Sequence, residues 1–145
     1  MRCSVAGRST VAGTTLRAVA SVFSTATQGF RLRECGVFNT TTTAAAVSLV
    51  FFTNATGVGA GLTEVQWDRG IDAAPTMTGF AAHTADGAVT SPVRQAVLGG
   101  VVGSGVIWTF GDYGLVVPIG TANGIGIICP TGAGQILDYY YDWEE

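Results

Sequence analysis

The residues best suited to catalysis are a single histidine and a serine within a glycine-rich run. His83 is the only histidine in the chain, so a serine hydrolase would need it as the general base. Ser104 lies between two glycines, but Val102 occupies the position where the nucleophile motif G-x-S-x-G needs glycine. The glycine-rich runs 57–61 and 99–105 lack the Gly-Lys-Ser/Thr ending of a phosphate-binding loop, and we interpret them as turns. We predict that the chain is not an enzyme and uses no cofactor.

Three carboxylates, Glu64, Asp68 and Asp72, recur at intervals of four residues. On a helix this spacing would align them for a hard cation such as calcium. Gly70 and the β-branched Val65 argue against a helix there. We therefore interpret the segment as a solvated acidic loop and expect no metal site, with cation binding as the alternative.

Charge is divided unevenly along the sequence. Five of the seven arginines precede the first acidic residue, Glu34, and every charged residue after Arg94 is acidic. Because arginine forms bidentate contacts with carboxylates, this division favours pairing between the two ends of the chain, within one subunit or between neighbouring subunits. We predict that the arginine-rich first third and the C-terminal segment contact a partner, through Arg2, Arg8, Arg17, Arg31, Arg33, Tyr139, Tyr141, Trp143, Glu144 and Glu145.

The overall composition restricts the class of protein. In the 145 residues, 48% are hydrophobic, only 12% are charged, and the formal net charge is -3. A disordered chain would carry more charge, and a nucleic-acid-binding protein would need an excess of cations, so we expect neither. The longest apolar run, residues 44–52, is too short to cross a membrane, and no secretion signal is evident. Three cysteines at irregular spacing are expected to be buried, reduced thiols.

The elements that position these residues are predicted to be strands. Short runs rich in Thr, Val, Ile, Phe and Tyr alternate with Gly, Asn, Asp and Pro, and helical periodicity is scarce. Strands are predicted at 15–23, 30–38, 45–52, 62–67, 76–84, 106–110, 115–118, 125–129 and 135–143, with one helical turn at 91–98. The strand 15–23 should have one solvated side, whereas 45–52 is apolar on both faces and should be covered. In the final strand, alternate residues from Leu137 to Trp143 should share one face.

Strands spaced about 8 to 12 residues apart, without a βαβ pattern, indicate an antiparallel sandwich or barrel. We predict an all-β fold, a single jelly-roll-like antiparallel β-sandwich of about eight strands spanning residues 1–145.

Several segments carry a resemblance to a known group of proteins. They are MRCSVAGRSTVAGTTL at the start, RECGVFN at 33–39, GVIWTFGD at 105–112, PIGTANGIGI at 118–127 and the closing DWEE. With these segments the chain resembles small virion proteins of tailed bacteriophages and prophages, and it is similar to jelly-roll head-decoration proteins. The resemblance implies a protein assembled in the bacterial cytoplasm, and it implies no catalytic residues.

The leading hypothesis is therefore a non-enzymatic capsid decoration or cement protein. It would form a symmetric homo-oligomer, with a trimer favoured, and would bind the phage major capsid protein in the assembled lattice. Large weakly polar surfaces, which so few charges imply, usually mark contact with other subunits. The alternative is a tail-tip or fibre module in which Trp67, Trp108 or Trp143 stacks on host glycans.

Overall fold

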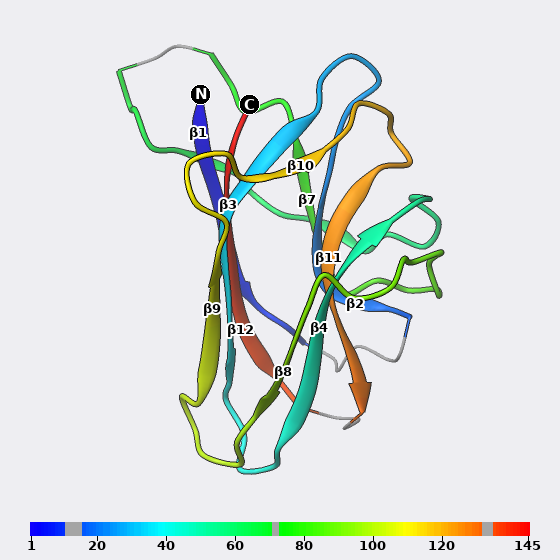
Figure 1. Cartoon of the computed structure of the whole chain (residues 1–145), viewed down its shortest axis with the longest axis vertical. Helices are drawn as coiled ribbons and strands as arrows, with labels where there is room; N and C mark the ends of the chain where they lie inside the picture. The colour runs from blue at the N-terminus through cyan, green and yellow to red at the C-terminus, as the bar shows by residue number, and fades with distance from the viewer. Residues whose placement is uncertain (11–15, 71–72, 132–134) are drawn as a thin grey trace.

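The computed structural model describes residues 1–10, 16–70, 73–131 and 135–145, and the regular secondary structure there is entirely β-strand. Two antiparallel sheets pack face to face (Figure 1). Sheet A contains β1 (Arg2–Arg8), β3 (Phe30–Asn39), β6 (Val65–Gln66), β9 (Gly105–Thr109), β10 (Leu115–Val117) and β12 (Leu137–Glu144). Sheet B contains β2 (Ala18–Phe23), β4 (Ala45–Phe52), β5 (Ala60–Gly61), β7 (Thr78–Ala81), β8 (Arg94–Leu98) and β11 (Gly124–Thr131). The prediction of an all-β antiparallel sandwich is confirmed.

The strand pairing is that of a jelly roll. Early strands pair with late ones: β1 with β12, β2 with β11, β3 with β9 and β4 with β8. Because β12 also pairs with β3, and β11 with β4, the sheets have the orders β1-β12-β3-β9 and β2-β11-β4-β8. These are the strands of five or more residues in the described part of the chain, and β5, β6, β7 and β10 extend the sheets.

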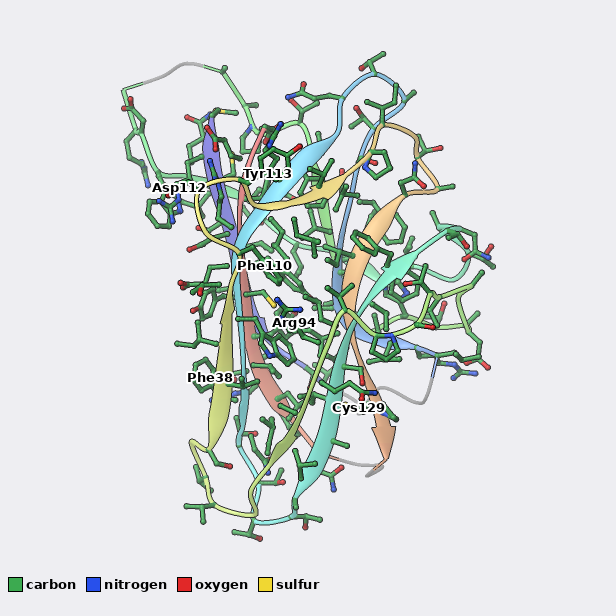
Figure 2. All side chains as sticks on the ribbon, in the orientation of Figure 1. Phe38, Arg94, Phe110, Asp112, Tyr113 and Cys129 are labelled. Atoms are coloured by element: carbon green, nitrogen blue, oxygen red, sulfur yellow. The ribbon has the colours of Figure 1, made fainter. Side chains whose placement is uncertain are left out.

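The segment between β4 and β8 widens one side of the sandwich. Within this segment, β6 pairs with β1 and β7 pairs with β2. At the opposite side, β8 and β9 are the outer strands of the two sheets, and a loop of six residues joins them. There Arg94 lies over the ring of Phe110, 5.6 Å from its centroid (Figure 2).

The main core lies between the sheets. It contains the inward-facing residues of both, among them Leu32, Leu49, Tyr141 and Trp143, each fully buried. The hydroxyl of Tyr141 on β12 donates a hydrogen bond of 2.8 Å to the carbonyl oxygen of Ala20 on β2, so a polar contact also joins the sheets. As predicted, the alternate residues of β12 from Leu137 to Trp143 share the buried face.

A second, smaller apolar cluster covers the outer face of sheet B. It includes Phe23, Val50 and Phe52, with Phe80 packed against it. The covered character predicted for residues 45–52 is thereby confirmed. The prediction that strand 15–23 has a solvated side is wrong for residues 18–23, since all of β2 is buried and this cluster lies over the face that was expected to be wet, whereas Arg17, just before β2, is exposed as predicted.

Two other local predictions are wrong. Residues 94–98 form β8 rather than a helical turn, because pairing with β4 provides the backbone hydrogen bonds and buries Leu98. Residues 2–8, for which no strand was predicted, form β1, in which Cys3 and Val5 face the core. The predicted strands 62–67 and 76–84 are present as shorter ones, β6 and β7.

Candidate functional site

The aromatic residues predicted to contact a partner lie in the core instead. Tyr139, Tyr141 and Trp143 alternate along β12 on its inner face, and each is 3% exposed or less. In this fold their side chains cannot reach a partner, so that part of the prediction needs correction. The alternation of large apolar residues along the last strand therefore indicates one buried face of β12 and not a surface for a partner.

The arginines of the first third pair with carboxylates of the same chain. Arg8 forms a bidentate pair with Asp138 at 2.6 and 2.9 Å across β1 and β12. Arg33 donates two hydrogen bonds to Glu144 across β3 and β12, one of them 3.0 Å long. The predicted pairing between the two ends of the chain is therefore found within one subunit. Arg17 pairs with Asp86 at 3.0 Å.

Two further arginines from this set lie against aromatic rings. The guanidinium of Arg2 lies 3.7 Å from the centre of the Trp67 ring. That of Arg31 lies 4.4 Å from the centre of Tyr113 and donates a hydrogen bond to its carbonyl oxygen. Glu145, the last predicted contact residue, accepts hydrogen bonds from the backbone of Thr76 and the indole of Trp143. Each of these charged residues therefore has an intramolecular role.

Several of these charged residues converge at one end of sheet A. A groove of about 450 Å³, which we call the sheet A groove, lies on the outer face; its lining includes Arg2, Arg33, Glu34, Thr109, Asp112 and Glu144. An adjoining hollow of about 540 Å³ shares three of these residues and adds apolar ones, including Val116 and Ile119. Asp112 and Tyr113 lie on the loop between β9 and β10, which borders the groove (Figure 2).

A β-bulge determines which side chains face the groove. Asp142 on β12 lies opposite Glu34, but its neighbour Trp143 lies opposite Leu32, so Arg33 is an extra residue on β3. Leu32 and Cys35 both point into the core. The two residues between them, Arg33 and Glu34, therefore both point outward. The bulge thus places a cation and a carboxylate side by side on the outer face.

The centre of this face carries two carboxylates from neighbouring strands. Glu34 accepts a hydrogen bond of 2.6 Å from the hydroxyl of Tyr140, whose ring lies over Gly36. Asp142 is only 8% exposed and lies opposite Glu34 in the pairing of β12 with β3. Burial raises the pKa of Asp142, the charge of Arg2 opposes this rise, and the charge of Glu34 adds to it. Burial and the bond to Glu34 also raise the pKa of Tyr140.

His83 is buried, and its partner is a serine that sequence reasoning did not single out. The Nε2 atom of His83 lies 2.7 Å from Oγ of Ser21, while Nδ1 has no partner among the described residues. Both side chains are buried, the His83 ring packs against those of Phe23 and Phe52, and burial lowers the pKa of His83 to about 4. A serine nucleophile needs access to a substrate, which this buried pair lacks.

The other candidates have local roles. Ser104 donates a hydrogen bond of 2.6 Å to the carbonyl oxygen of Gly99 in the loop between β8 and β9. Glu64 accepts a bond from the backbone of Gly79, and Asp68 accepts one from Gly70. Asp72 lies outside the described residues; among those described, no group of three or more His, Cys, Asp or Glu side chains could hold a metal ion.

The cysteines are buried, as predicted: Cys3, Cys35 and Cys129 are each 3% exposed or less. Of the tryptophans considered for glycan stacking, Trp108 and Trp143 are also buried. Only Trp67 has an exposed ring, and Arg2 lies over it.

Four strongly exposed aliphatic side chains lie around the β8–β9 edge, by which we mean β8, β9 and the loop that joins them; Ile119, which is 60% exposed, lies elsewhere, between β10 and β11. Val97 is 77% exposed, Val101 69%, Val102 63% and Ile107 51%. Because β8 and β9 are the outer strands of their sheets, each also has one row of backbone groups outside the sheet hydrogen-bonding pattern. Sequence reasoning predicted weakly polar surface in general, but it did not locate this edge.

No protein-family model, curated protein or solved structure matches this chain. No helix in the described ranges has the length and apolar character needed to cross a bilayer.

Proposed function

We propose that this chain is a non-enzymatic structural protein of a phage virion. In this proposal it is a capsid decoration or cement protein that assembles with copies of itself and binds the phage major capsid protein. The observation that carries the proposal is the β8–β9 edge, where four aliphatic side chains are more than half exposed. Exposed apolar groups on an unprotected sheet edge favour association, and soluble proteins usually cover or charge such edges.

The fold is compatible with this role. Jelly rolls occur in viral capsid proteins as well as in lectin-like domains, so the fold alone supports the proposal only by analogy. The phage assignment within the proposal comes from the resemblance of five sequence segments to phage virion proteins. The glycan-binding alternative receives less support, since Trp108 and Trp143 are buried and Arg2 occupies one face of Trp67.

A decoration protein would act by a simple thermodynamic route. Because it binds the assembled lattice and not the free capsid subunits, its binding free energy adds to the stability of the lattice. Joining several copies raises the effective concentration of each remaining contact after the first has formed. Self-association through an apolar edge would provide that multivalency.

Sedimentation velocity of Val97→Lys tests the role of the edge. We expect the wild-type chain to sediment as an oligomer, and Val97→Lys to shift it to the monomer, because a charge on an outer strand opposes edge association. Val65→Lys is the matched control: Val65 is 46% exposed on β6, at the other side of the sandwich, and this variant should remain oligomeric. A wild-type monomer at all concentrations would contradict the proposed self-association.

A further inference from the structure

Two aromatic side chains lie across the outer face of sheet A. Phe38 on β3 and Tyr140 on β12 both alternate with buried residues and point away from the core, and Figure 2 shows Phe38 on the side of sheet A that faces away from sheet B. Each ring lies over a glycine of the neighbouring strand: Tyr140 covers Gly36 on β3, and Phe38 covers Gly105 on β9. A side chain at either glycine would occupy the space that the ring fills, so the two glycines let the rings rest on the sheet.

The two rings form one continuous surface, which we call the aromatic platform (Phe38 and Tyr140). Their centroids are 6.4 Å apart, and their planes differ by only 20°. Because the rings lie over different strands, this separation runs along the sheet, and the rings lie side by side. Both residues are partly exposed, and Ala6, which lies opposite Tyr140 on β1, is too small to cover them. The outer faces of the rings are therefore open to a ligand.

Hydrogen-bonding groups lie beside the platform. The hydroxyl of Tyr140 donates a hydrogen bond of 2.6 Å to Glu34, another outward-facing residue of β3. Asp138 lies opposite Phe38 in the pairing of β12 with β3, and it holds Arg8 in a bidentate pair. A carboxylate offers about four acceptor sites, and a phenol oxygen can accept a hydrogen bond as well as donate one. The platform thus has an apolar centre with hydrogen-bonding groups at its margins.

This combination fits a sugar better than a protein surface or a nucleic acid. A pyranose with equatorial hydroxyls has C–H groups on its faces and hydroxyls around its rim, so it can lie on an aromatic ring while its rim bonds to polar groups. The centre of a protein interface is instead depleted of charged residues. Nucleic acid bases also stack on aromatic rings, but their phosphates would meet Glu34 and Asp138 on a chain of formal net charge -3. The same carboxylates disfavour acidic sugars.

We propose that the aromatic platform binds a neutral glycan of β-linked pyranose units, with Phe38 and Tyr140 each stacking on one unit. A chain of β-linked glucose or N-acetylglucosamine is a flat ribbon whose faces can lie on both rings, whereas an α-linked glucose chain coils. Glu34 and Asp138 accept hydrogen bonds from hydroxyls at the rim of the sugars. This inference goes beyond the proposed structural role, and it uses none of the tryptophans considered for glycan stacking from the sequence.

Calorimetric titration of the full chain with oligosaccharides tests the platform. We expect cellohexaose or chitohexaose to bind, and the α-linked maltohexaose to bind at least about 10-fold more weakly. Phe38→Ala and Tyr140→Ala should each weaken binding by about 10-fold, because each removes one stacking surface. Tyr140→Phe keeps the ring and loses only the bond to Glu34, so its affinity should stay within about fivefold of the wild type.

Tyr113→Ala is the matched control. Tyr113 is 70% exposed on the loop between β9 and β10, so it is more accessible than either platform residue but lies outside the platform. This variant should bind like the wild type, and so should Trp67→Ala, which removes the exposed tryptophan ring. An NMR titration of the wild type gives a second readout that needs no variant to fold: the sugar should shift the backbone amides around residues 36–38 and 138–140.

The inference is refuted if neither β-linked oligosaccharide binds at about 10 mM, or if binding survives both alanine changes. Equal binding of maltohexaose would refute the β-linked ligand. Amide shifts confined to other elements, or loss of binding only in Trp67→Ala, would refute the platform as the site. If Phe38→Ala and Tyr140→Ala instead abolish self-association in sedimentation velocity, the rings contact a second copy and the inference also fails.

Failure of this inference can be told apart from failure of the proposed function. A chain that self-associates but binds no sugar would refute the platform and leave the role of the β8–β9 edge standing. A monomer that binds a β-linked oligosaccharide through Phe38 and Tyr140 would refute the proposed self-association and support the platform.

Discussion

The buried histidine predicts an acid-sensitive fold. His83 is held neutral by burial, with a pKa of about 4 instead of its usual 6.5. The unfolded chain therefore binds a proton below about pH 6.5, whereas the folded chain does not until about pH 4. Because the unfolded state binds more protons in that window, stability is complete above pH 6.5 and falls as the pH is lowered toward 4.

The size of this effect follows from the two pKa values. Each unit of difference between them corresponds to about 1.4 kcal/mol, so the total is at most about 3.4 kcal/mol. About 2 kcal/mol of this should be lost between pH 7 and pH 5, and residual solvent screening makes that an upper value. Other ionisable groups also contribute to the pH dependence of stability, so a reference variant is needed.

Urea unfolding, followed by the fluorescence of the buried Trp108 and Trp143, measures the loss. In His83→Gln the side chain can still bond to Ser21 but has no proton to gain between pH 7 and pH 5. The difference in unfolding free energy between wild type and variant should therefore fall by up to about 2 kcal/mol over this interval. An NMR titration of the wild-type imidazole gives the folded pKa even if the variant does not fold. A flat difference, or an imidazole that titrates near 6.5, would refute the reasoning.

Three other changes have definite expected outcomes. Tyr141→Phe removes the hydroxyl that joins β12 to the carbonyl of Ala20, and urea unfolding should show a loss of about 1–2 kcal/mol, because a buried acceptor is left unpaired. Gly36→Val places a side chain where the Tyr140 ring lies, so the same assay should show a loss of about 1–3 kcal/mol, and an unchanged midpoint would contradict that packing. Burial raises the pKa of the Cys3 thiol to about 12, and it also raises the pKa of the Cys35 thiol. Neither thiol should therefore react with a disulfide reagent at pH 8 until urea is added. Rapid labelling of the native protein would contradict the buried core described here.

Much of the fold could be predicted because period-two patterns report burial directly. The last strand shows this most clearly, since the alternation from Leu137 to Trp143 matches the buried face of β12. The strand 45–52 was predicted with its observed bounds because it is apolar throughout. By contrast, β8 is short and mostly exposed, and only its pairing with β4 makes it a strand, so no local pattern distinguishes it from a helical turn.

The candidate site was only partly predictable. The uneven distribution of charge correctly indicated that Arg8 and Arg33 pair with acidic residues of the C-terminal segment. It did not reveal the Asp142–Glu34 pair, because their position opposite each other depends on a bulge that adds Arg33 to β3. The contact between Ser21 and His83 joins residues 62 positions apart, and it depends on how the 82–89 segment covers sheet B. Such arrangements follow from register and packing between distant strands.

The proposal that this chain decorates a phage capsid is tested most directly by electron cryo-microscopy of phage particles purified from the source of the chain. We predict density for the jelly roll on the outer surface of the capsid, in symmetric clusters, with the β8–β9 edge covered by neighbouring copies or by the major capsid protein. Particles that lack the chain, together with a monomer in solution whose β8–β9 edge stays exposed, would contradict the account.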